Sequence, residues 1–343
     1  MLRLQTSRRA TARLILGVSV LIALLVSLAG LRSIASAESF DPNAAEGLQI
    51  SPALVELNAE QGKTYTLKLK ILNVTNSDLI YDSSINDFGA KDETGSPQVL
   101  FDSDLPASAS VRGWITTLEQ FRLRGQETRQ LDVQVQIPVN AEPGGHYGVI
   151  TFSGKTPELV DTGVGVTART GLLVLIRVDG AIQEKLSLAS FTAERNNKQH
   201  GFFESSPMTF VSRLKNEGNV HVKPVGKVEV RDMFGGLVAS LPVNEPAANV
   251  LPGSIRRFES ELHKDWMIGR YSANLTLGYG TTGQAITGQI SFWVIPYKLL
   301  LAGSAILVTL FYILRRLIRV YNRHIIKKAK QTNANKTKKR KNK

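Results

Sequence analysis

The chain has 343 residues, a net charge of +13 and no cysteine. Without cysteine there is no disulfide framework, no thiolate metal site and no thiol nucleophile. Residues 1–37 carry five basic side chains and residues 315–343 carry thirteen, and neither segment has an acidic one. Residues 38–297 hold all 29 acidic side chains and 23 basic ones. Because the excess of positive charge lies only beside the apolar runs, we expect no specific nucleic-acid binding.

The first 37 residues have the pattern of a secretory signal peptide. Four arginines precede the apolar run Leu14–Leu31, which is followed by the small residues Ala35-Ser36-Ala37. An apolar run of 18 residues is longer than a usual signal sequence requires, so an uncleaved signal anchor is an alternative. Residues 38–47 have no apolar period and are predicted to form a short exposed lead-in.

Short strands dominate the pattern from residue 48 to residue 293. Polar and apolar residues alternate over 64–71, 131–137 and 227–231, as in strands with one buried face. Gly171–Val178 is almost continuously apolar, which predicts a central strand buried on both faces or a strand between domains. Turn-forming clusters separate these segments and no helical period appears. We therefore predict an all-β fold of two tandem immunoglobulin-like antiparallel β-sandwiches.

A faint internal repeat divides this region. Three landmarks recur in the same order and predict domain 1 over residues 48–180 and domain 2 over residues 181–293. The first copy has about 19 extra residues, which we place in the acidic stretch 82–112. Such turns are also common to unrelated β-sandwiches, so duplication is one of two interpretations. The paired landmarks are Asn73 with Asn216, Gly125 and Arg129 with Gly253 and Arg257, and Gly145-His146-Tyr147 with Gly269-Arg270-Tyr271.

A transmembrane helix is predicted over residues 294–314. The apolar run there contains one charge, Lys298, and aromatic residues lie near both ends. The excess of basic residues in 315–343 predicts a cytoplasmic tail and places residues 38–293 outside the cytoplasm. The proximal tail, 315–330, also has an apolar side, which favours contact with anionic lipid.

Catalytic motifs are almost absent from the exported part. His146, His200, His221 and His263 are isolated and lack the spacing of zinc ligands. Ser212-Arg213-Leu214-Lys215 matches Ser-x-x-Lys, but we interpret it as a chance match within a strand. We therefore expect no enzyme, no catalytic, cofactor-binding or metal-binding residue, and no cofactor.

Two smaller assignments concern acidic and aromatic residues. The acidic stretch is either a solvated loop or a weak calcium site. Trp114 and Tyr147 are predicted to lie in the core between the sheets of domain 1. The carboxylates considered for calcium are Asp82, Asp87, Asp92, Glu93, Asp102 and Asp104.

Several motifs of residues 48–180 resemble a bacterial surface-domain family that includes the peptidoglycan-binding domain of the WxL-interacting proteins. The resemblance implies the same plan for the whole chain: a signal peptide, two immunoglobulin-like sandwiches, a transmembrane helix and a basic tail. It also implies a cell-wall polymer as ligand. The motifs are Ile50-Ser51-Pro52, Gly62-Lys63-Thr64, the Asn73 turn, Gly113-Trp114-Ile115, Ile137-Pro138, Ala141–Ile150 and Ala168-Arg169-Thr170-Gly171.

The sequence thus favours a non-catalytic, single-pass membrane protein that binds peptidoglycan or another surface protein through its immunoglobulin-like domains. The alternative is an accessory or chaperone-like subunit of an envelope assembly such as a secretion or pilus apparatus. The two differ in what they contact. A wall polymer should bind exposed aromatic and polar loop residues, whereas an assembly partner should cover an apolar patch or a strand edge.

Overall fold

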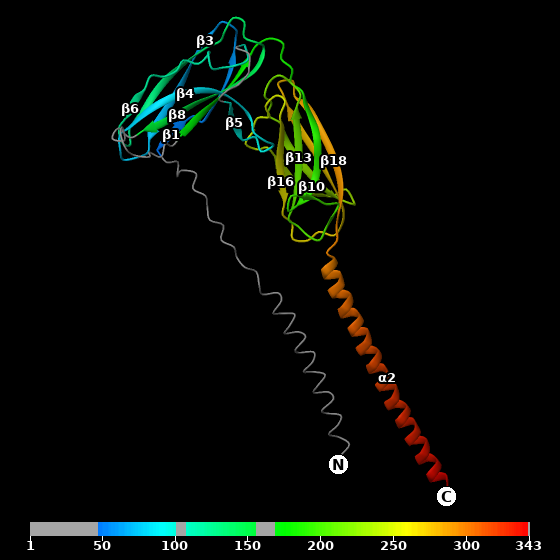
Figure 1. The fold of residues 1–343 in the computed structure, drawn as a ribbon. Helices are drawn as coiled ribbons and strands as arrows, with labels where there is room; N and C mark the ends of the chain where they lie inside the picture. Colours follow the sequence, from blue (N-terminus) through cyan, green and yellow to red (C-terminus); the bar gives the residue numbers. More distant parts are fainter. Residues whose placement is uncertain (1–46, 101–107, 156–168, 342–343) are drawn as a thin grey trace. The chain divides into compact units, whose positions relative to one another are not determined.

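The computed structural model describes residues 47–100, 108–155 and 169–341. The predicted signal peptide and almost all of the predicted lead-in lie outside these residues. The described chain folds as two immunoglobulin-like β-sandwiches followed by one apolar helix, as predicted (Figure 1). Between residues 47 and 294, the described residues contain strands and turns but no helix.

The first sandwich has a sheet in the order β1-β3-β7 and a facing sheet in the order β2-β9-β8-β4-β5, with β6 also paired to β4. Its buried core lies between these two sheets, from Leu48 to Val178. The strands are β1 (Leu48–Ser51), β2 (Leu54–Ala59), β3 (Thr64–Asn73), β4 (Leu79–Ala90), β5 (Pro97–Leu100), β6 (Phe121–Leu123), β7 (Thr128–Gln136), β8 (Gly144–Lys155) and β9 (Arg169–Val178).

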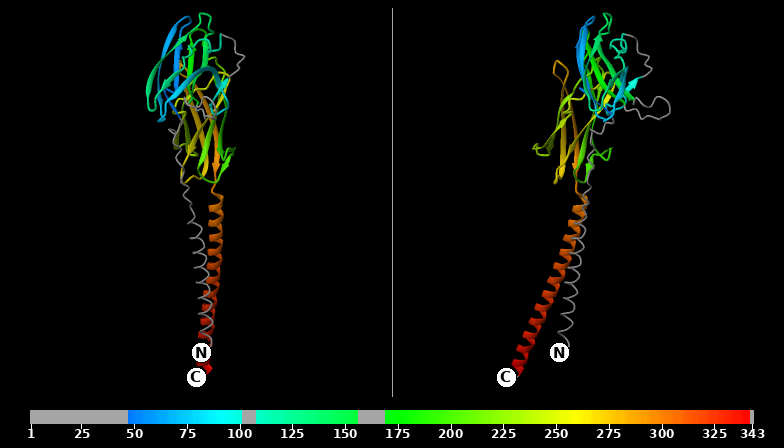
Figure 2. Two further views of the ribbon diagram at one scale, coloured as in Figure 1. Left: turned by 60° about the vertical axis from the view of Figure 1, so that its left-hand side comes forward. Right: turned by 90° about the vertical axis from the view of Figure 1, so that its left-hand side faces the viewer.

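The second sandwich has a sheet in the order β11-β10-β13-β16 and a sheet in the order β12-β18-β17-β14-β15. A separate core from Leu186 to Val294 fills it, and Figure 2 shows its strands from two further directions. The strands are β10 (Leu186–Arg195), β11 (Lys198–Gln199), β12 (Phe202–Phe203), β13 (Met208–Asn216), β14 (Val225–Asp232), β15 (Leu237–Val243), β16 (Ile255–Leu262), β17 (Gly269–Tyr279) and β18 (Gln284–Val294).

The pairing is not antiparallel throughout. β1 pairs antiparallel with β3, but after Ser51-Pro52 the chain continues as β2 and pairs parallel with β9 in the facing sheet. Proline has no amide hydrogen to donate to a ladder, so it suits the point where the strand leaves one sheet for the other. A short parallel pair also joins β12 to β18.

The helix α2 (Tyr297–Lys341) begins three residues later than predicted. Val294 is fully buried as the last residue of β18, and Pro296 follows it before the helix starts. The first 27 residues of α2 are long and apolar enough to cross a membrane, and none of the most apolar part is buried. The helix continues without a break into the basic tail as far as Lys341.

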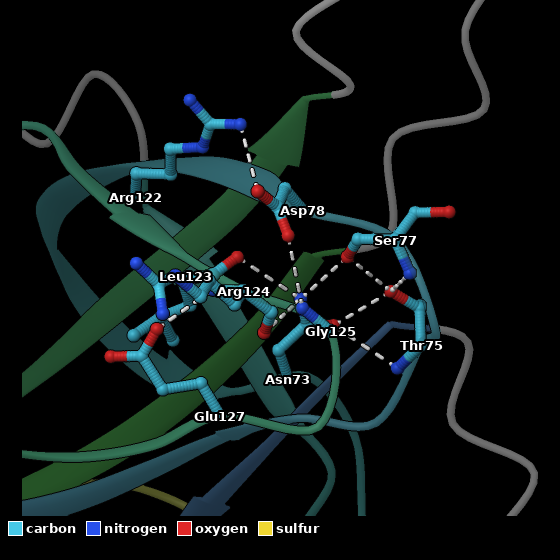
Figure 3. A network of polar contacts seen from close by, with 9 residues as sticks. All are labelled: Asn73, Thr75, Ser77, Asp78, Arg122, Leu123, Arg124, Gly125 and Glu127. Atoms are coloured by element: carbon cyan, nitrogen blue, oxygen red, sulfur yellow. Dashed lines mark hydrogen bonds and ion pairs between the residues drawn. The ribbon is translucent and has the colours of Figure 1, made fainter.

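Each sandwich contains one fully buried asparagine with corresponding contacts, at the first landmark of the predicted repeat. The amide nitrogen of Asn73 donates to the carbonyl oxygens of Ser77, Leu123 and Arg124, at 2.9, 3.3 and 3.0 Å (Figure 3). Its oxygen accepts hydrogen bonds from the amide and hydroxyl of Thr75. One side chain thereby satisfies the polar backbone groups of two loops at the end of the sandwich.

Asn216 repeats this arrangement in the second sandwich. Its amide nitrogen donates to the carbonyl oxygens of Val220 and Val250, both at 2.8 Å, and its oxygen accepts from the amide of Gly218. The strand registers also agree, since Asn73 pairs with the first residue of β1 and Asn216 with the first residue of β10. Like Asn73, Asn216 lies where the end of one strand meets the start of another.

The second landmark of the repeat is displaced by one residue. Gln126 adopts the left-handed conformation that Gly253 has in the second copy, with φ of 62° and 73°. The ladder then sets Arg129 opposite Ile71 and Arg256 opposite Leu214. Arg129 therefore corresponds to Arg256 and not, as the sequence match indicated, to Arg257.

We predict that replacing either buried asparagine destabilises its sandwich. Asn73→Ala and Asn216→Ala each leave buried carbonyl groups without a donor, which should lower the free energy of unfolding by about 2–4 kcal/mol. Asn58→Ala, at an exposed position of β2, is the matched control and should change it by less than about 0.5 kcal/mol. Denaturant unfolding of the full chain in detergent measures all three, and equal effects at positions 58 and 73 would contradict the prediction.

Candidate functional site at the junction of the two sandwiches

The sheet that contains β9 is apolar on both faces. Leu172, Val174 and Ile176 point into the core of the first sandwich, while the alternate residues Leu173 and Leu175 point to the outside. This confirms the prediction for Gly171–Val178 of a strand buried on both sides. On the outer face, Leu175 forms a small cluster with residues of β4 and β8 and with Leu251 of the second sandwich. The second sandwich therefore covers part of this face.

Tyr147 lies on this outer face, so its assignment to the core between the sheets was wrong. The neighbouring residue His146 occupies the core position, and its ring centroid lies 4.5 Å from that of Trp114. Trp114 is itself buried in the core, as predicted. Tyr147 instead contacts Phe88 and brings its hydroxyl 3.3 Å from Nδ1 of His221 in the second sandwich. Because successive strand residues face opposite ways, a misassignment by one position moves a side chain to the other face.

Asn219 ties the second sandwich to the start of β8. Its carbonyl oxygen accepts a hydrogen bond from the amide of Gly145 at 2.8 Å, and its side-chain oxygen accepts from the amide of Gln183 at 2.7 Å. A Cβ atom on Gly144, which has a φ of +133°, would come within 2.9 Å of the carbonyl oxygen of Asn219. Glycine at this position therefore permits the two sandwiches to approach closely.

Charged groups add further contacts across the junction. The carboxylate of Glu56 in β2 lies 2.5 Å from Nζ of Lys223 and accepts a hydrogen bond from the amide of Asn249 at 2.8 Å. Burial raises the pKa of Glu56, but the hydrogen bonds from Lys223 and Asn249 together with the charge of Lys223 bring it below the usual value. Glu56 is therefore a carboxylate at neutral pH.

The turn between β4 and β5 holds the edge of the second sandwich. The carbonyl oxygen of Glu93 accepts a hydrogen bond from the amide of Arg257 on β16 at 2.7 Å. The carboxylate of Glu93 lies 2.7 Å from Nε of Arg213 on β13. This turn belongs to the predicted extra segment 82–112, so part of that segment connects the two sandwiches.

The described carboxylates of that segment have protein donors as partners. Asp82 pairs with Lys155, and Asp92 accepts from the amide and hydroxyl of Thr94. Asp87 is buried and accepts from the hydroxyl of Ser110. Asp102 and Asp104 lie outside the described residues, and within the described ones no three acidic or histidine side chains group as metal ligands.

The histidines of the two sandwiches have separate partners within the described residues. His146 is held between the carbonyl oxygens of Ala109 and Glu142, His221 lies at the junction, and His263 contacts Glu261 on the surface. Ser212 is buried within β13, as expected for a strand and not for a helix start.

A cavity of about 410 Å³ opens between the sandwiches. Phe88, Leu173, Leu175 and Leu251 supply an apolar floor, and the exposed Leu54 of β2 lies at its margin. Its polar wall consists of Glu56, Lys223, Asn249 and Arg256. The cavity thus combines an apolar surface with hydrogen-bonding groups of both kinds.

Two of these polar groups have unused hydrogen-bonding capacity. The side-chain oxygen of Asn249 is buried and has no hydrogen-bond partner among the described residues. Arg256 donates to the carbonyl oxygen of Asn249 at 2.6 Å and lies over the ring of Phe258, but it forms no ion pair with any residue that the structure describes. Burial lowers the pKa of this guanidinium below its usual value. An unused acceptor and a partly used donor therefore border the same apolar floor.

No protein-family model and no curated protein matches the chain. Among solved structures, it is similar to the class 5 fimbriae chaperone CfaA, with 12% identity, a TM-score of 0.37 and coverage of 71% of this chain and 98% of that one. It is also similar to the E. coli chaperone DraB, with 14% identity, a TM-score of 0.33 and coverage of 72% and 96%. The Pseudomonas aeruginosa CupB2 chaperone matches with 12% identity, a TM-score of 0.31 and coverage of 69% and 97%.

The junction should weaken as the pH falls, because His221 is a partly buried, neutral ring. Burial lowers its pKa from 6.5 to about 4, although the charge of Glu56 acts in the opposite direction. In the unfolded chain the His221 ring takes up a proton below pH 6.5, but in the folded chain it does so only near pH 4. The contribution of the neutral ring to the free energy of unfolding is therefore fully present above pH 6.5 and is lost as the pH falls towards 4. Between pH 7 and pH 4.5 the loss should reach about 2 kcal/mol.

Denaturant unfolding at several pH values measures this effect. His221→Gln should remove the part of the pH dependence that lies between pH 6.5 and 4.5, because glutamine does not titrate. His263→Gln, which alters a largely exposed side chain, is the control and should keep the dependence of the parent chain. The same pH dependence in the parent and in His221→Gln would contradict the prediction.

Proposed function

We propose that the protein is a non-catalytic, membrane-anchored envelope protein that binds an extended segment of a partner protein in the cavity between its sandwiches. The observation that carries this proposal is the combination of an apolar floor with an unused acceptor, Asn249, and a partly used donor, Arg256. An extended peptide offers both backbone amides and carbonyls at regular intervals, together with alternating side chains. Such a segment matches both features of the cavity.

The edge strand β2 supports a peptide ligand further. β2 is the last strand of its sheet and pairs only with β9 among the described strands. An unpaired edge is a template for an additional strand. Leu54, at the start of β2, is 43% exposed and borders the cavity, so an added segment could place apolar side chains against the floor.

This arrangement favours an assembly partner over a wall polymer. The residues that line the cavity are largely apolar, and its aromatic ring, Phe88, is buried and offers no exposed platform for a sugar. Peptidoglycan binding, implied by the resemblance of residues 48–180, is therefore the competing prediction. We propose accordingly that the chain serves as an accessory or chaperone-like subunit of an envelope assembly.

The apolar part of α2 supports a single-pass anchor in this proposal. The helix meets the length and composition needed to cross a bilayer, and the charges after Arg315 favour a cytoplasmic tail. The ectodomain, residues 38–293, would then lie outside the cytoplasm. The basic part of α2 would lie near anionic lipid of the inner surface.

Protease added to intact cells tests the orientation. It should degrade residues 38–293 and leave an epitope placed after Lys341 protected, because the basic flank stays on the cytoplasmic side. A cytoplasmic marker protein serves as the control for cell integrity. Degradation of the tail epitope while the marker remains intact would contradict the proposed orientation.

Peptide binding to the full chain in nanodiscs tests the cavity. A display library of eight-residue peptides should yield ligands that alternate apolar and polar residues, and fluorescence anisotropy gives their affinity. Leu54→Asp and Arg256→Gln should each weaken binding at least about tenfold, equivalent to about 1.4 kcal/mol. Val139→Asp changes another exposed apolar residue, 81% exposed, which does not line the cavity, and should leave the affinity unchanged.

Purified peptidoglycan sacculi provide the opposing measurement. If the chain sediments with sacculi, and if Leu54→Asp binds them as well as the parent while no peptide binds, the wall-polymer interpretation holds and the proposed function is wrong.

A further inference from the structure

Exposed apolar side chains gather at one end of the second sandwich. The fold leaves them outside both cores, although residues of this kind are usually buried. They come from the loops 233–236 and 263–268 and from the neighbouring strands β12 and β15, and they include three aromatic rings. The most exposed are Phe234 at 90%, Trp266 at 78%, Phe202 at 69%, Ile268 at 63%, Leu237 at 56% and Met233 at 55%.

Strand register places these loops at the end from which α2 emerges. In the sheet β12-β18-β17-β14-β15, Asp232 pairs with Tyr271, and Gly269 pairs with Val294, the last residue of β18. The turn 233–236 follows Asp232, and the loop 263–268 precedes Gly269, so both lie at the level where β18 ends. β12 pairs there as well, with Phe202 opposite Trp293.

The connection to the helix is short. Ile295 and Pro296 separate β18 from Tyr297, and the amide of Ile295 donates to the carbonyl oxygen of Phe203 at 2.8 Å. Three residues of extended chain span at most about 10 Å. Measured along the strand direction, the exposed side chains therefore lie within about 10 Å of the first turn of α2.

The loops hold these side chains outward. The carboxylate of Asp232 accepts hydrogen bonds from the amides of Phe234 and Gly236, both at 2.9 Å, and closes a tight turn with Phe234 at its tip. In the next loop, the hydroxyl of Tyr271 both accepts from the amide and donates to the carbonyl of Ile268. The loop backbones are thus fixed by hydrogen bonds while their apolar side chains remain without protein contacts that would bury them.

We propose that this end of the second sandwich is a membrane-contacting surface, seated in the headgroup region of the bilayer that holds α2. The occupant is lipid because the surface is continuous with the start of the apolar helix, where Trp293 and Tyr297 are also exposed. Tryptophan and tyrosine favour the interface between headgroups and hydrocarbon, and the nearby Lys264 and Arg270 suit lipid phosphates. The inference goes beyond the proposed peptide binding and rests only on the anchoring of α2.

Single cysteines carrying a nitroxide spin label test this surface, and the chain allows it because it has no cysteine of its own. The full-length protein is reconstituted in vesicles of phosphatidylcholine and phosphatidylglycerol. Collision rates are measured with oxygen, which concentrates in lipid, and with a nickel chelate, which stays in water. The labelled variants are Phe234→Cys at the tip, Thr282→Cys in the exposed turn at the opposite end of the same sandwich, and Val308→Cys within α2.

We expect the label at position 234 to collide more with oxygen than with the chelate, as at position 308, and the label at position 282 to show the reverse. Phe234 and Thr282 are exposed, so neither change should prevent folding. If position 308 is in lipid but position 234 behaves like position 282, the surface is aqueous and the inference is wrong while the anchor stands. If the label at position 234 collides with neither oxygen nor the chelate and shows dipolar broadening with another label, a second copy of the protein covers this surface. That result would also overturn the inference. An aqueous signal at position 308 would refute the anchor itself, and with it this inference, whereas peptide binding in the cavity would be unaffected.

Discussion

The apolar outer face of the sheet β2-β9-β8-β4-β5 is the constraint on which the junction depends. A sandwich normally buries one face of each sheet, but here Phe88, Val149 and Leu175 make the second face apolar too. Such a face has to be covered, and burial of each large apolar side chain is worth about 1.5–3 kcal/mol. The second sandwich supplies Leu251 to this cluster and leaves a cavity beside it. The contact between the two sandwiches and the cavity beside it thus have one cause.

The polar contacts at the junction set its geometry more than its strength. Three separate polar contacts cross the junction. They are the hydrogen bond between Asn219 and Gly145, the ion pair of Glu56 with Lys223, and the backbone hydrogen bond from Arg257 to Glu93. Partly exposed ion pairs contribute little free energy each, about 0–1 kcal/mol. Directional hydrogen bonds nevertheless select one arrangement of the two sandwiches, because a shifted arrangement would leave backbone groups at the junction without partners. Neutral His221, partly buried among them, makes this arrangement of the two sandwiches sensitive to acid.

The sequence predicted the class of fold because its signals are local. Period-two alternation identified β3, β7 and β14, and the continuous apolar run identified β9 as buried on both faces. The repeated asparagine was also visible, since Asn73 and Asn216 end strands in the same way. Tyr147 was misplaced because a side chain's face depends on where its strand begins, and this cannot be read from Gly-x-Tyr alone. Arg256 and Asn249 gave no signal, because they meet Phe88 and Leu173 only through tertiary contacts far apart in the chain.

The two kinds of exposed apolar residue in this chain differ in the polar groups beside them. Those around the cavity, such as Leu54, lie beside unused donors and acceptors and a free strand edge, so a ligand that covers them must also satisfy backbone-like polar groups. Those at the end next to α2, such as Phe234 and Ile268, belong to loops in which their own backbone amides already have side-chain partners. A disordered solvent such as lipid can cover the second kind without any directional contact, whereas whatever covers the first kind must also supply hydrogen-bonding groups. One chain therefore presents two apolar surfaces that differ in the hydrogen bonds they still require.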